Sequence, residues 1–103
     1  MPNPIKIRAK AMGSDVDVKA LIAHDMETGF RKTADGQIVP AHYIQTLVVK
    51  CNERVVLQAN WGPAVSKDPF FSFQFKGGAV GDTIEINWLD SQGIRRTDKT
   101  KVQ

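Results

Sequence analysis

The sequence predicts an all-β protein, folded as an immunoglobulin-like antiparallel β-sandwich of about seven strands. Seven short segments alternate or run apolar as strands do, turn residues separate most of them at intervals of roughly ten residues, and no segment has a helical period. At 103 residues the chain is long enough for one core, so we expect a single domain over residues 1–103. A single cysteine excludes an antibody-type disulfide, and a small open barrel is the alternative architecture.

The first two predicted strands each have one face toward water. Residues 5–11 alternate isoleucine or alanine with lysine or arginine, and residues 16–22 follow after a Gly13-Ser-Asp15 turn. Leu21 interrupts the polar face of the second segment. Residues 24–41 then lose the strand period, and this connection of about 18 residues is long enough to be functional or disordered. Its Asp35-Gly36 pair predicts a turn, and its apolar residues (Phe30, Ile38 and Val39) predict an ordered loop with a short hairpin.

The remaining segments form two predicted hairpins and a last strand. Residues 42–50 are apolar on both faces, which predicts a strand covered on both sides, and residues 54–61 return after Asn52-Glu53. Residues 70–76 and 83–89 pair around a glycine-rich turn, with an inward set made of Phe71, Phe73, Phe75, Ile84, Ile86 and Trp88. Asp90 begins the next turn, and the charged residues 94–102 suit an exposed edge strand.

Composition argues against several functions. The fourteen Lys and Arg against eleven Asp and Glu give a net charge of +3, but the basic residues are scattered, so we expect no nucleic-acid binding. No stretch approaches the ~18 apolar residues of a membrane helix. The N-terminus lacks the apolar region of a secretory signal, which by itself indicates the cytoplasm.

Two histidines and two sulfur residues invite a copper interpretation, because imidazole and soft sulfur ligands suit that metal. The four residues are His24, Met26, His42 and Cys51. Blue-copper sandwiches gather such ligands in one late loop, whereas this chain has no histidine after position 42 and no methionine after position 26. We therefore expect no metal, no cofactor and no enzyme activity, with a small metal-binding sandwich using His24 and His42 as an alternative.

Simpler roles account for the same side chains. We expect His24 to be a loop residue bonded to a neighbouring carboxylate, Asp25 or Glu27, and His42 to lie at the surface where a strand starts. Cys51 is expected to be a small, partly buried residue near a strand end. No strand-to-helix elbow is predicted that would present a catalytic nucleophile.

Apolar residues on strand faces that the alternation places toward solvent predict a partner interface. Burying each such side chain contributes about 1.5–3 kcal/mol, enough in combination for a lasting contact. Scattered apolar residues are also normal on monomers. The expected interface residues are Ile44, Val48, Val56, Leu21 and Leu89, of which the first three fall on one hairpin and could form a continuous patch.

Several motifs occur together and in order along the chain. They include His24-Asp-Met-Glu-Thr-Gly29, Trp61-Gly-Pro-Ala-Val-Ser-Lys-Asp-Pro-Phe70 and Phe75-Lys-Gly-Gly78. With them, the whole chain resembles the SoxZ family, the small subunit of the SoxYZ carrier in bacterial thiosulfate oxidation. A generic immunoglobulin-like protein-binding module is the alternative.

The resemblance implies a non-catalytic subunit that binds SoxY, whose C-terminal arm carries sulfur intermediates on a cysteine while it visits the other thiosulfate-oxidation enzymes. It also implies a periplasmic protein exported together with its partner, against the cytoplasm that the missing signal suggests. Two loops, residues 24–29 and 61–70, are then free to meet the arm or the enzymes it visits. The residues expected to face them are His24, Asp25, Met26, Trp61, Lys67 and Pro69.

Overall fold

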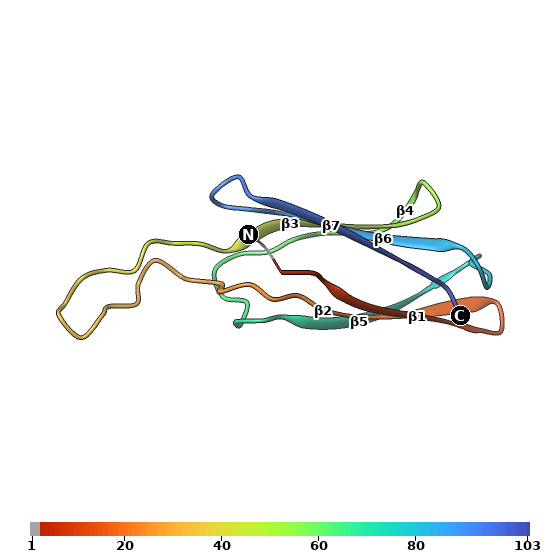
Figure 1. Ribbon diagram of the computed structural model, residues 1–103, viewed down its shortest axis with the longest axis horizontal. Coiled ribbons are helices and arrows are strands. Elements are labelled where there is room, and N and C mark those ends of the chain that lie inside the picture. The colour runs from red at the N-terminus through yellow and green to blue at the C-terminus, as the bar shows by residue number, and fades with distance from the viewer. Residues whose placement is uncertain (1–2) are drawn as a thin grey trace.

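A computed structural model describes residues 3–103 and has two antiparallel sheets packed face to face (Figure 1). One sheet has the order β1-β2-β5, and the other has the order β4-β3-β6-β7. Their strands are β1 (Lys6–Met12), β2 (Asp15–Leu21), β3 (Ile44–Cys51), β4 (Arg54–Asn60), β5 (Phe70–Lys76), β6 (Thr83–Asp90) and β7 (Arg95–Lys101). This architecture confirms the predicted all-β sandwich of seven strands. Nowhere in residues 3–103 is there a helix with the length and apolar character needed to cross a membrane.

The core lies between the sheets and is built from alternate residues of the central strands. Val16 and Val18 of β2 face Leu47 and Val49 of β3, together with the inward residues of β6, and all are fully buried or nearly so. Burying a side chain of this size stabilises the fold by about 1.5–3 kcal/mol, so the period-two pattern of these strands largely determines the architecture.

Two bulges reverse the faces predicted for one hairpin. A register shift between Ile44 and Thr46 turns Ile44 inward with Leu47, and Ile44 is 0 % exposed. In β4 the extra residue is Val56, which packs against the core, while its neighbour Val55 is 50 % exposed. Because a bulge inserts one residue into a strand, the simple alternation fails there. The prediction that Ile44 and Val56 lie on an outer patch is therefore wrong.

The two long sides of the sandwich are closed to different degrees. On one side Ala11 and Ala9 bond to Gln103 through the main chain, and the Ile5 N–H donates to Asp98 Oδ2 at 2.9 Å. On the other side β4 and β5 are the last strands of their sheets. There the predicted inward phenylalanines of β5 pack against the core but stay half-buried, because no strand continues the sheet beyond β5 within residues 3–103.

The long connection forms a projecting ribbon, which we define as residues 27–42. Isolated antiparallel pairs join Glu27 to His42 and Lys32 to Ile38, and the turn between them includes Gly36, whose φ of 86° favours glycine. The predicted hairpin is thus present, and in Figure 1 it runs out beyond both sheets. Phe30 is 85 % exposed and Ile38 is 61 % exposed, so neither side chain packs into the core.

Candidate functional site

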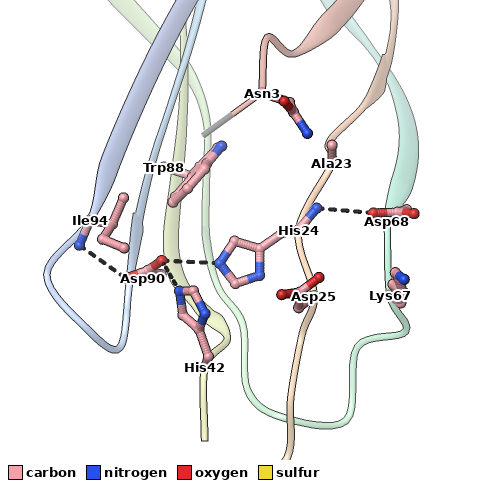
Figure 2. Close-up of a pocket in the computed structure, with 10 residues that line it drawn as sticks. All are labelled: Asn3, Ala23, His24, Asp25, His42, Lys67, Asp68, Trp88, Asp90 and Ile94. Carbon is pink, nitrogen blue, oxygen red and sulfur yellow. Dashed lines mark hydrogen bonds and ion pairs between the residues drawn. The ribbon is translucent and has the colours of Figure 1, made fainter. Parts of the chain in front are cut away.

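The two histidines converge on one carboxylate at the end of the sandwich from which the ribbon projects. His24 lies after β2, His42 lies before β3, and Asp90 ends β6. Asp90 Oδ2 is 3.0 Å from His24 Nε2 and 2.6 Å from His42 Nε2 (Figure 2). Three segments that are distant in the sequence are therefore joined at a single buried oxygen.

Asp90 has partners for both of its carboxylate oxygens. Oδ1 accepts the main-chain N–H groups of Gln92, at 2.9 Å, and Ile94, at 3.0 Å, which closes the turn between β6 and β7. Burial alone would raise the pKa of this carboxyl, but the hydrogen bonds from His24, Ile94, His42 and Gln92 outweigh it and hold the pKa below its usual value. Asp90 is therefore a carboxylate at neutral pH despite a fully buried side chain.

The hydrogen bonds of His24 assign its tautomer. The Met26 N–H donates to His24 Nδ1 at 3.1 Å, so that nitrogen carries no proton. The proton is on Nε2, which donates it to Asp90. The residue is 7 % exposed, and its ring packs edge-on against that of Trp88, with ring centroids 5.1 Å apart and ring planes at 90°. Both ring nitrogens of His24 are thus engaged in hydrogen bonds within the fold.

The same three side chains have the spacing of a metal site, since their ligand atoms lie within 4.8 Å of one another. A histidine that binds a metal presents a bare nitrogen to the ion and donates its other N–H to a second group. His24 has the opposite arrangement, with Nε2 protonated toward Asp90 and Nδ1 accepting from the main chain. The geometry thus favours a hydrogen-bonded His–Asp–His cluster over a metal centre.

The sulfur atoms of the copper interpretation do not join this cluster. Met26 is buried, and its sulfur accepts the Ile44 N–H at 3.4 Å. Cys51 lies at the opposite end of β3, where burial and the neighbouring Asp82 raise the pKa of its thiol. Of that set, only the two histidine side chains meet, and the carboxylate partner of His24 is Asp90 rather than Asp25 or Glu27.

A cavity of about 450 Å³ opens beside the cluster, as Figure 2 shows. The two loops that the resemblance singled out contribute His24, Asp25, Lys67 and Asp68 to its lining, and the other lining residues are Asn3, Ala23, His42, Trp88, Asp90 and Ile94. The His24 N–H donates to Asp68 Oδ1 at 3.1 Å, and the Asp68 N–H donates to the His24 carbonyl at 2.9 Å. These two hydrogen bonds fix the two loops to each other, so the wall of the cavity is preformed.

Three of the six loop residues predicted to face a partner line this cavity, namely His24, Asp25 and Lys67. The other three do not line it. Met26 and Pro69 are buried within the fold, so neither is available to a partner. Trp61 is half-buried against Phe71, with ring centroids 5.8 Å apart, because its ring covers the end of the β5 aromatic row.

The predicted interface residues divide between opposite sheets. Val48 pairs with Asn87, two residues from Leu89, so Val48 and Leu89 are neighbours on the outer face of the larger sheet. Leu21 pairs with Lys6 and Phe70 on the outer face of the other sheet. With Ile44 and Val56 turned inward, the five residues do not form one patch.

Comparison with known protein families shows to which family the chain belongs. The family model described as "Sulphur oxidation protein SoxZ" matches residues 5–101. The chain belongs to the SoxZ family. The resemblance seen in the sequence is thereby confirmed, and the family is one of sulfur oxidation.

Among solved structures, the chain is similar to a superoxide reductase (neelaredoxin) from Ignicoccus hospitalis. The TM-score is 0.66 at 12 % sequence identity, over 99 % of this chain and 80 % of that one. An identity this low shows a shared fold alone. The curated proteins contain no match to the chain.

Two important residues of the site were not predicted. Asp90 was assigned to a turn, although it continues the inward series Ile84, Ile86, Trp88 and is itself buried. The period of β6 was therefore a usable signal for it. Trp88 was expected in the core and is buried there, but nothing in the sequence indicated that it also lines a cavity.

Proposed function

We propose that this chain is the non-catalytic subunit of a SoxYZ carrier. It binds SoxY and supports it while the C-terminal cysteine of SoxY carries covalent sulfur intermediates during thiosulfate oxidation. The observation that carries the proposal is the family match over residues 5–101. The complex works in the periplasm, where the chain arrives together with its partner.

The outer face of the larger sheet is the proposed SoxY contact. Val48 of β3 and Leu89 of β6 are half-buried neighbours at the centre of this face, and Val55 is exposed at its β4 edge. Apolar side chains on a flat sheet face contribute to binding when a partner removes them from water. Leu21, beside Phe70 on the other sheet, is proposed as a separate and smaller contact.

The cavity end of the sandwich is the proposed meeting point with the SoxY arm. His24 and Asp25 lie on one side of the cavity, and the exposed Lys67 lies on the other. The Lys67 ammonium offers a cation to an anionic sulfur adduct on the arm. Because main-chain bonds join the two loops, the side chains are held ready before the arm arrives.

Co-purification tests the proposal. The chain, co-expressed with a SoxY chain and purified through a tag on SoxY, is expected to elute with it as one stable complex on size exclusion. A tagged, unrelated immunoglobulin-like domain is the matched control and is expected to retain none of the chain. If the two elute separately at micromolar concentration, the generic protein-binding alternative replaces this proposal.

A further inference from the structure

The fold gathers basic side chains that are scattered in the sequence onto the outer face of the β1-β2-β5 sheet, which is turned away from the other sheet (Figure 1). Lys6 and Arg8 of β1 and Lys19 of β2 are exposed there. Together with the exposed Leu21 and Phe70, they are among the residues that line a groove of about 530 Å³. No carboxylate of residues 3–103 lines this groove. Three cations therefore lie close together in a chain whose net charge is +3.

The positive charge of the groove is not neutralised within the fold. Arg8 and Lys19 lie directly opposite each other in the β1–β2 pairing, and Lys6 is two residues before Arg8 on the same face. Like charges at opposite positions on neighbouring strands destabilise a sheet. Asp17, the next outward residue of β2, lies opposite Lys10 instead, and in the described part of the chain no carboxylate forms an ion pair with the three groove cations. A negatively charged partner would relieve this repulsion.

The spacing of the cations favours an extended peptide over a small anion. Alternate residues of a strand are about 7 Å apart. Lys6 and Arg8 therefore match acidic residues at every second position of an extended segment that lies along β1. A small anion would reach only one or two of these exposed side chains, and each exposed ion pair contributes little in water. Nucleic acid would need more phosphate contacts than three cations provide.

The apolar end of the groove places a second requirement on the partner. Lys6 pairs with Leu21, and Leu21 pairs with Phe70, so both apolar side chains lie at the Lys6 end of the groove. They are 38 % and 64 % exposed. An apolar residue of a partner would remove part of this surface from water. Two such side chains offer little to a lipid surface, because membrane binding increases with the apolar area that is buried.

We infer that this groove binds an extended acidic segment of a second protein. Two carboxylates at alternate positions of the segment pair with Lys6 and with the Arg8–Lys19 pair, and one apolar residue beside them packs against Leu21 and Phe70. The groove and the face proposed for SoxY belong to different sheets, so both can be occupied at once. The inference gives the separate contact at Leu21 a partner chemistry, and it holds whether or not the chain binds SoxY.

Two synthetic peptides of equal composition test the spacing. The probe is the acetylated peptide Leu-Ser-Glu-Ser-Glu, used also in the reverse order, and the control is Leu-Ser-Ser-Glu-Glu, in which the carboxylates are adjacent. Titrating the probe into the ¹⁵N-labelled chain is expected to move the amide resonances of residues 6–8, 19–21 and 70 with one dissociation constant. The control peptide should bind at least threefold more weakly. Raising the NaCl concentration tenfold should weaken the binding of the probe several-fold.

Charge reversal supplies the matched variants. Arg8→Glu is expected to weaken binding of the probe about tenfold, yet to raise the urea midpoint of unfolding, because a glutamate would stand opposite Lys19. A purely structural role of Arg8 would not move the two readouts in opposite directions. Lys32→Glu makes the same charge change in the exposed ribbon and is expected to leave the affinity within twofold.

Four results would overturn the inference. The first is the absence of any shift at millimolar probe, and the second is an equal loss of affinity in Arg8→Glu and Lys32→Glu, which would make net charge alone responsible. Sodium thiosulfate that moves the same resonances and displaces the probe would assign the groove to a small anion. Sedimentation with vesicles of phosphatidylcholine and phosphatidylglycerol that is lost in Arg8→Glu, without binding of the probe, would assign it to a membrane surface.

Discussion

Replacing Asp90 by asparagine is the most direct test of the His–Asp–His cluster. The amide has nearly the shape of the carboxylate, and its oxygen can take the place of Oδ1, which accepts the N–H groups of Gln92 and Ile94. Its nitrogen then takes the place of Oδ2 and presents hydrogens to two Nε2–H donors. His24 cannot change tautomer to relieve this conflict without losing the Met26 N–H.

The expected cost follows from how deeply each bond is buried. The His24 bond joins side chains that are 4 % and 0 % exposed, so its loss costs about 1.5–3 kcal/mol, the range for hydrogen bonds to charged groups. The His42 side chain is 24 % exposed, and water can replace part of its bond, which leaves about 0.5–1 kcal/mol. We expect Asp90→Asn to lower the free energy of unfolding by about 2–4 kcal/mol.

Urea unfolding at pH 7 measures this loss, provided that the dependence on urea is the same in both proteins. Asp35→Asn, in the exposed turn of the ribbon, is the matched control and should leave the free energy of unfolding nearly unchanged. In the Asp90→Asn background, His42→Ala should lower the free energy of unfolding only a little further, because the His42–Asp90 hydrogen bond is already lost. A loss below about 1 kcal/mol for Asp90→Asn would refute the structural role assigned to the cluster.

Four further predictions follow from the structure. Val48→Glu places a charge on the proposed SoxY face, so it should abolish the complex on size exclusion while the circular dichroism of the isolated chain stays unchanged. Lys67→Glu should slow thiosulfate turnover in the reconstituted system severalfold, and unchanged turnover would rule out its contact with the sulfur adduct. Gly78→Ala would put a methyl group against a β2 side chain, costing about 1–3 kcal/mol in urea unfolding, whereas Gly62→Ala meets open space and should cost less. Because the folded-state pKa of Asp90 is depressed, its stabilisation is present above about pH 4 and is lost as the pH falls through the folded value, so acid titration of Asp90→Asn should show a shallower loss than the parent chain.

Much of the fold could be predicted because strand periodicity is a local property of the sequence. The strand predicted over residues 70–76 has the observed bounds of β5, and the other six agree within about two residues. The hairpin around Asp35-Gly36 was also predictable, since its turn residues favour that geometry.

The wrong predictions of inward and outward side chains fall where one inserted residue exchanges the two faces of a strand. The bulges near Ile44 and at Val56 exchange inside for outside, and no residue type in those strands marks a bulge. The partner of His24 was missed for a different reason. Asp90 lies 66 positions away in the sequence and ends a strand of the other sheet, so only the packing of the two sheets brings it to His24.

The aromatic strand β5 has a consequence for how the free chain behaves in solution. Its residues Phe-Phe-Ser-Phe-Gln-Phe combine high β-propensity with no proline and no charge until Lys76, which is the composition of a cross-β segment. The strand lies at the end of its sheet, with Phe70 64 % exposed, so its main chain is a template for another copy. The chain should therefore be least prone to self-assembly when a partner is present from the time of synthesis, and concentrated solutions of the isolated subunit should form thioflavin-positive fibres first through this edge.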